Sequence, residues 1–199
     1  MGKALITIME WLYKLVFLNS IWILYSLPIV TIIPATAAMF AVMDKWIREE
    51  DDDEPYFKLF NRKFKQFFWK SYPLGLALLI IGGILIIDLL FLSNATSALW
   101  LVARYALIGV TILFFISFLY SFPIFIRYQY PWYKTMLFSF MLGIRQPIVT
   151  IMGFCGILLI VFLFLFVTGI GILFFASLFA LVSTMVAQVS SKSVIEEGA

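Results

Sequence analysis

Two ionisable side chains lie inside otherwise apolar sequence, where a charge is most able to do chemistry. Asp88 and Arg104 are the only charged residues between positions 71 and 126. Asp88 precedes Ser93 by five residues and Arg104 follows Ala98 by six, so in a helical hairpin both would lie about 8 Å from the turn. Because a charge facing lipid is costly, we predict a structural ion pair between them, or snorkelling to the interface, in preference to proton or substrate coupling.

The residue types that usually perform catalysis or bind metals are scarce. The chain has no histidine, which is the usual general base and the commonest transition-metal ligand. Its single cysteine, Cys155, lies in an apolar segment and is interpreted as a packing residue. No glycine-rich phosphate loop precedes a predicted helix. We therefore predict no catalytic residue, no cofactor and no metal site, and we expect that the protein is not an enzyme.

An amphipathic helix is predicted over residues 55–70, because aromatic residues recur every three or four positions and basic residues mark the other side. The aromatic members are Phe57, Phe60, Phe64 and Phe68, and the basic members are Lys58, Arg62 and Lys65. Such a helix suits the headgroup region, where anionic lipid attracts its cations. The alternative is a docking surface for a partner protein.

Local charge argues against nucleic acid as a partner. Residues 44–70 carry seven basic and seven acidic residues, so the net charge of this segment is near zero. The acidic residues are concentrated before Pro55, in a stretch that we interpret as a solvated loop.

Two prolines interrupt the first apolar segment. Pro28 and Pro34 each remove a backbone donor and disfavour helix at the preceding residue, so residues 29–33 are predicted to be extended or irregular. Either the prolines only kink the helix, or the break exposes backbone groups to a polar ligand together with Asn19, Thr31 and Thr36.

Composition indicates that membrane-spanning helices position the residues described above. Hydrophobic residues make up 64% of the 199 residues and charged residues 13%, against about 25% charged in soluble domains, so a bilayer must cover much of the chain. A span takes about 20 apolar residues, and the 42-residue apolar stretch 148–189 must therefore fold back, at residues 168–171. The predicted spans are residues 15–42, 72–92, 101–126, 148–167 and 170–189, and the predicted interfacial helices are 55–70 and 131–145. The predicted fold is one all-α membrane domain over residues 1–199, a bundle of about five transmembrane helices with a proline-broken first span.

Basic residues indicate the orientation. They are concentrated in residues 44–70 and 127–145, whereas residues 93–99 and 168–171 have none. The positive-inside rule therefore predicts a multi-pass protein with both basic segments and the C-terminus in the cytoplasm. The N-terminus is outside if residues 15–42 cross once, and inside if they form a re-entrant hairpin.

The first apolar segment also carries a recognisable pattern, followed by a basic and aromatic stretch. Its residues are Asn19, Trp22, Pro28, Ile29, Val30, Thr31, Pro34, Ala35, Thr36 and Ala37. Over about residues 15–75 the chain resembles the YesL-like family of bacterial integral membrane proteins. It departs from the family in having Ile33 where glycine commonly precedes the second proline.

The resemblance implies a location in the bacterial cell membrane and an accessory role in carbohydrate uptake, because family members tend to be encoded beside carbohydrate ABC uptake systems. The implied partners are the permease or ATPase subunits of an ABC sugar importer, besides the lipid bilayer. No catalytic residues come with the resemblance.

Three classes of function are compatible with these observations. The first is a non-enzymatic accessory protein of an ABC importer. The second is a small transporter or channel. The interrupted helix supports this class, whereas the small number of polar groups in the membrane interior argues against it. The third is an intramembrane enzyme, which a lone Asp88 makes the least supported class.

Overall fold

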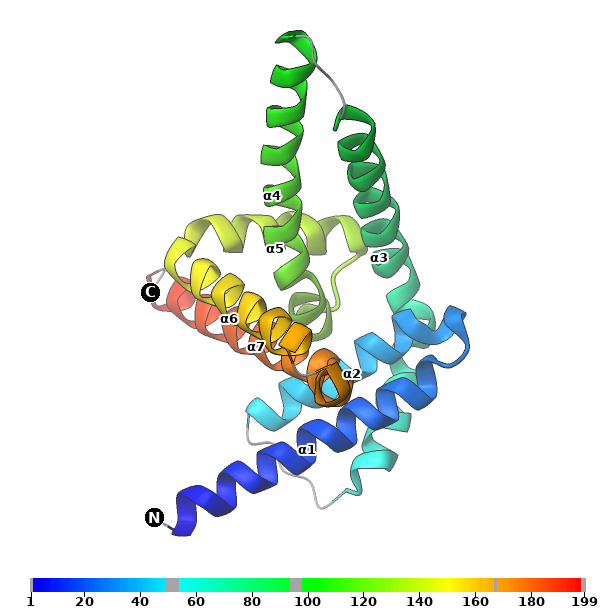
Figure 1. The fold of residues 1–199 in the computed structure, drawn as a ribbon. Helices are drawn as coiled ribbons and strands as arrows, with labels where there is room; N and C mark the ends of the chain where they lie inside the picture. Colours follow the sequence, from blue (N-terminus) through cyan, green and yellow to red (C-terminus); the bar gives the residue numbers. More distant parts are fainter. Residues whose placement is uncertain (1, 49–53, 94–97, 167, 198–199) are drawn as a thin grey trace.

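The computed structural model describes residues 2–48, 54–93, 98–166 and 168–197, and these residues are almost entirely helical (Figure 1). The elements are α1 (Gly2–Ser26), the 3-10 turn η1 (Ile29–Thr31), α2 (Ile32–Ile47), α3 (Tyr56–Leu92), α4 (Ala98–Tyr128), α5 (Trp132–Arg145), α6 (Pro147–Phe166) and α7 (Thr168–Glu197). Within these described ranges, five helical segments are long and apolar enough to cross a membrane, or six if α5 and α6, bent by 103°, form one broken span. The all-α, multi-pass prediction is confirmed.

Three antiparallel hairpins make up most of the fold. In the α3–α4 hairpin, Arg104 lies near Ser93 and Lys70 lies near Gln129. In the α6–α7 hairpin, the rings of Phe164 and Phe175 are 5.4 Å apart. The α3–α4 hairpin rises to the top of Figure 1, and the other two hairpins cross below it.

The third hairpin is formed by α1 and α2. Three contacts join the two helices: Tyr25 with Thr31, Trp22 with Thr36, and Lys14 with the Trp46 ring at 5.8 Å. Positions that lie further before the turn in α1 contact positions that lie further after it in α2, which is the pattern of an antiparallel pair. The two helices therefore lie side by side, as in the hairpin alternative, rather than forming one distorted span. The helix α1, from Leu5 to Ser26, and the segment Ile29–Ile47, which is η1 together with α2, are each long and apolar enough to be a candidate span.

The geometry of the turn differs in detail from the sequence prediction. Residues 29–33 were predicted to be extended or irregular, whereas residues 29–31 form a 3-10 turn and α2 begins at Ile32, two residues before Pro34. Pro34 is tolerated there because the first four N–H groups of a helix have no partner within the helix.

The helix α2 is the centre of the core. Most of its residues are buried, including a run of small and apolar side chains from Ala37 to Met43. The ring of Phe40 stacks on Phe122 of α4 at 5.3 Å and meets Phe179 of α7 edge-on at 6.2 Å. Small residues let neighbouring helices approach closely, so α2 can contact α1, α3, α4 and α7 at once.

The predicted boundary between an interfacial helix 55–70 and a span 72–92 is wrong, because α3 runs without interruption from Tyr56 to Leu92 and contains Pro73. A change from charged to apolar sequence marks a change of surroundings, and a helix does not have to end there because its hydrogen bonds are internal. Pro73 removes one of those hydrogen bonds. The next two residues, Leu74 and Gly75, are buried, so packing against the rest of the bundle supports the helix at this point.

The second half of the chain follows the predicted segments closely. The helix α5 agrees with the prediction for 131–145, and α6 begins at Pro147. Residues 168–171, where the chain was predicted to fold back, belong to α7, which begins at Thr168, and α6 ends at Phe166. Thr135 and Ser139 of α5 are buried, whereas Leu137, Met141 and Ile144 are exposed, so the outer face of α5 is apolar. Its interfacial position stays a prediction.

Candidate functional site

Polar residues of the pattern in the first apolar segment form a network of hydrogen bonds at the α1–α2 turn. The Thr31 hydroxyl lies 2.6 Å from the Tyr25 carbonyl oxygen and 2.7 Å from that of Pro28, and closes the turn. Trp22 Nε1 donates to Thr36 Oγ1 at 3.2 Å, and Thr36 Oγ1 donates to the Ile32 carbonyl at 2.8 Å. These side chains therefore satisfy helix ends and tie α1 to α2.

Two further contacts join this turn to the rest of the bundle. Asn19 is 1% exposed, and its Oδ1 accepts a bond from the Ser177 backbone N–H of α7 at 3.2 Å. Tyr72 of α3 donates its hydroxyl to the Val30 carbonyl at 3.0 Å. Buried polar groups need such partners. Asn19, Thr31 and Thr36 are thus placed at three separate contacts and do not converge on one polar site.

The aromatic side of the predicted amphipathic helix faces the protein. Phe60 is fully buried, Phe64 and Phe68 are half-buried, and Phe57 is 48% exposed. Tyr25 of α1 lies among them, with its ring centroid 5.1 Å from Phe60 and 4.8 Å from Phe64. Phe60 is therefore not available to lipid or to a partner, because α1 already covers it.

The basic side of the same helix remains on the surface. Lys58, Arg62 and Lys65 are exposed, and Trp69 is 79% exposed. These four residues, at spacings of four, three and four, follow one line along α3 and are called the basic stripe below. The Arg62 guanidinium forms an ion pair with Glu54 at 2.8 Å. The acidic residues 49–53 lie outside the described part of the chain.

The predicted Asp88–Arg104 pair is wrong, because no ion pair joins these two residues in the described α3–α4 hairpin. The Asp88 side chain is exposed on α3, and Arg104 Nη1 instead donates to the Ser93 carbonyl at 3.3 Å. The alternative, snorkelling of these side chains to the interface, stays a prediction.

A cluster of hydroxyl groups that was not predicted from the sequence joins α4, α6 and α7. Tyr120, fully buried, has its hydroxyl 2.8 Å from Thr150 Oγ1 and 3.2 Å from Ser190 Oγ. Arg127 Nη1 donates to Ser191 Oγ at 2.7 Å. The seven-residue spacing of serine and threonine at 183–184 and 190–191 was the visible signal, because such spacing places these residues on one helix face.

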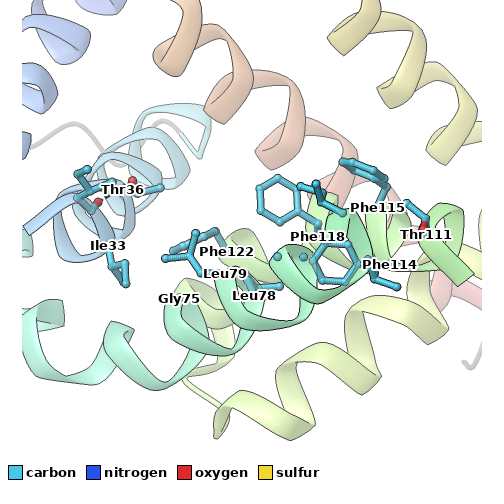
Figure 2. Close-up of a pocket in the computed structure, with 15 residues that line it drawn as sticks. Ile33, Thr36, Gly75, Leu78, Leu79, Thr111, Phe114, Phe115, Phe118 and Phe122 are labelled. Atoms are coloured by element: carbon cyan, nitrogen blue, oxygen red, sulfur yellow. Dashed lines mark hydrogen bonds between the residues drawn. The ribbon is translucent and has the colours of Figure 1, made fainter. Parts of the chain in front are cut away.

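An apolar cleft of about 510 Å³ opens between α2, α3 and α4 (Figure 2). Its walls come from Ile33 and Thr36 on α2, from Leu78 and the glycines of α3, and from the phenylalanines of α4. No charged side chain lines it. Within the described ranges, no group of three or more histidine, cysteine, aspartate or glutamate residues could hold a metal ion, and Cys155 is exposed. The cleft can therefore accept an apolar molecule, and it contains no arrangement for acid–base or nucleophilic chemistry.

Comparison with known proteins places this architecture in a family. A family model described as "Protein of unknown function, DUF624" matches residues 15–89, which include the turn and most of α3. The chain is 31% identical to the uncharacterized protein YteU of Bacillus subtilis (strain 168) over 172 residues, covering 85% of this chain and 77% of YteU. It is 29% identical to YesL of the same organism, covering 87% of this chain and 83% of YesL, and 31% identical to YesV, covering 71% and 69%. No solved structure matches the chain. With this similarity extending over most of its length, the chain belongs to the YesL-like DUF624 family of proteins with several membrane-spanning helices.

Proposed function

We propose that the protein is a non-enzymatic accessory subunit that binds the cytoplasmic side of an ABC sugar importer through the basic stripe of α3. The observation that carries the proposal is the division of the first half of α3 into a buried aromatic side and an exposed cationic side. The aromatic side is covered by α1, whereas Lys58, Lys65 and Trp69 face outwards. An exposed aromatic residue such as Trp69 is typical of protein interfaces, and exposed cations steer association with an acidic partner surface.

The polar residues of the family pattern support a role in assembly. Asn19, Trp22, Thr31 and Thr36 are engaged in hydrogen bonds within the fold. They hold α1 against α2 and α7, and so fix the surface that α3 is packed on. The importer as the partner rests on the resemblance of the chain to the YesL-like family.

The cytoplasmic location of the stripe rests on the positive-inside rule. Two contacts support a common side for the basic segments: Lys70 Nζ lies 3.3 Å from Gln129 Oε1, and Arg127 binds Ser191. They place Lys70 of α3, the end of α4 and Ser191 of α7 close together.

The test is affinity purification from native membranes in mild detergent, followed by mass spectrometry. The variant Lys58→Glu/Lys65→Glu reverses two charges of the stripe. Lys134→Glu/Arg145→Glu is the matched control, because it reverses two exposed charges on α5. Importer permease or ATPase subunits are expected with the wild type and the control, and reduced roughly tenfold with the stripe variant.

Two results would contradict the proposal: recovery of no importer subunit with the wild type, and equal recovery with both double variants. Because detergent removes the bilayer, loss of importer subunits in the stripe variant reports on protein contact and not on attraction of the stripe to anionic lipid.

A further inference from the structure

The cleft between α2, α3 and α4 has the length of one membrane leaflet. On α3 its lining runs from Gly75 to Ile86, and on α4 from Thr111 to Phe122. Eleven residues of helix correspond to about 16 Å, and half of a hydrocarbon core is about 15 Å. Its volume of about 510 Å³ is in the range of about 300–1,000 Å³ typical of ligand pockets.

The chemistry of the lining calls for a hydrocarbon. In Figure 2 the labelled phenylalanines of α4 and leucines of α3 gather around the cleft, with only two hydroxyl groups among the labelled residues. Thr36 Oγ1 donates to the Ile32 carbonyl and Thr111 Oγ1 to the Leu107 carbonyl, both at 2.8 Å. Since both hydroxyl protons are engaged in their own helices, neither needs a polar ligand.

The cleft is continuous with the outer, lipid-facing surface of the α3–α4 hairpin. Leu79, Ile86 and Phe115 line the cleft and are 65%, 59% and 50% exposed. These two helices are candidate membrane spans. A lipid chain next to the hairpin can therefore enter the cleft from the side without crossing a polar barrier.

A cation lies beyond one end of the cleft, on the same helix face. Thr111, Phe118 and Phe122 follow Arg104 by seven, fourteen and eighteen residues, and all three spacings return to nearly the same direction on a helix. Arg104 precedes Thr111 by about 10 Å along the axis, which leaves room for a glycerol backbone between a phosphate at Arg104 and a chain in the cleft.

Asp88 does not neutralise this cation. It follows Gly75 by thirteen residues, a rotation of about 220° that turns it away from the cleft face of α3. In the described hairpin, Arg104 contacts the Ser93 carbonyl and no carboxylate. A guanidinium with spare donors is well matched to a phosphate oxygen.

We propose that this cleft holds one acyl chain of an anionic phospholipid whose phosphate binds Arg104. The site is separate from the basic stripe, so the proposal does not depend on the importer hypothesis. A bound lipid would fill the space between α2 and the α3–α4 hairpin and would stabilise their contact.

Two glycines provide a matched test of the cleft. Gly83 lines it, Gly109 on α4 does not, and a Cβ atom added at either position meets no atom within 4 Å. Gly83→Leu therefore adds a side chain at the wall of the cleft with an unobstructed Cβ, and Gly109→Leu adds the same side chain, also with an unobstructed Cβ, away from the cleft. Native mass spectrometry of protein purified in mild detergent and incubated with phosphatidylglycerol is expected to show one bound lipid for the wild type and for Gly109→Leu. We expect roughly tenfold less for Gly83→Leu.

The phosphate contact is tested at Arg104. Arg104→Gln is expected to reduce bound phosphatidylglycerol roughly tenfold and to leave binding of a phosphate-free diacylglycerol unchanged, whereas Arg104→Lys retains most of the phosphatidylglycerol. Equal loss of both lipids in Arg104→Gln would overturn the phosphate assignment.

A measurement on the wild type keeps the proposal falsifiable if a variant does not fold. Phosphatidylglycerol with a photoactivatable group in its acyl chain is incorporated into proteoliposomes, and the labelled residues are mapped. Labelling concentrated on Phe114 and Phe118 is expected, with less on Leu158 and Leu159, which are exposed on α6. Equal labelling of both helices, absence of a retained lipid on the wild type, or equal retention by Gly83→Leu and Gly109→Leu would each overturn the proposal.

Discussion

Phe60→Ala should destabilise the protein far more than Phe57→Ala, although both residues belong to one aromatic pattern. Phe60 is 0% exposed and its ring packs edge-on against Tyr25 at 5.1 Å, whereas Phe57 is 48% exposed. Removing a buried phenylalanine costs about 3–5 kcal/mol. A half-exposed one loses roughly half of a full burial energy, about 1–1.5 kcal/mol.

These free energies correspond to a clear difference in melting temperature. For a protein of this size 1 kcal/mol shifts Tm by about 2–4 °C, so Phe60→Ala should lower Tm by roughly 6–20 °C and Phe57→Ala by roughly 2–6 °C. Thermal unfolding in detergent, followed by near-ultraviolet circular dichroism, measures both shifts. If the aromatic side lay in the headgroups, the more exposed Phe57 would matter as much as Phe60. A shift for Phe57→Ala equal to or larger than that for Phe60→Ala would therefore refute the buried position.

Three further predictions follow from the described contacts. Asn19→Ala should lower Tm by roughly 1–6 °C, because it removes the hydrogen bond between the Asn19 side chain and the buried Ser177 N–H, worth about 0.5–1.5 kcal/mol, whereas Ser20→Ala at the exposed neighbouring position should change Tm by less than about 2 °C. Gly143→Ala should reduce the yield of folded protein, because the added Cβ collides with the Ile116 side chain. Adding Ile116→Ala to this variant should restore the yield. A double variant that folds no better than Gly143→Ala alone would contradict the close contact of α5 with α4. Asp88→Asn and Asp88→Ala should give equal yields of folded protein, because the exposed carboxylate has no ion pair with Arg104, and a lower yield for Asp88→Ala alone would restore the pairing hypothesis.

Phe60 and Lys58 show what the spacing of residues along a helix can predict. The three- and four-residue spacing correctly separated an aromatic side from a basic side of one helix. Periodicity tells which residues share a face and not what covers that face. Only the packing of α1 and α2 onto α3 decided that the aromatic side is in the protein core and not in the headgroups.

The hydroxyl cluster and the cleft could not be predicted from residue spacing, because each is formed by several helices. Tyr120, Thr150 and Ser190 come from three helices, and the cleft is formed by α2, α3 and α4. Contacts between distant segments depend on helix rotation and crossing, and a single sequence does not contain these quantities. For that reason the sequence placed Asp88 and Arg104 at one depth but did not decide whether they pair.

The sequence by itself determined the elements of this protein. Length, hydropathy and the positions of proline and glycine predicted an all-helical, multi-pass chain, because a backbone in lipid must satisfy its hydrogen bonds internally. The residues of the first apolar segment also indicated the family. The tertiary structure alone decided that α1 and α2 form a hairpin, that Phe60 is buried while the basic stripe is exposed, and that an apolar cleft opens between α2, α3 and α4. Local composition sets the energy of each segment in lipid or water, whereas the relative rotation of packed helices sets which side chains meet.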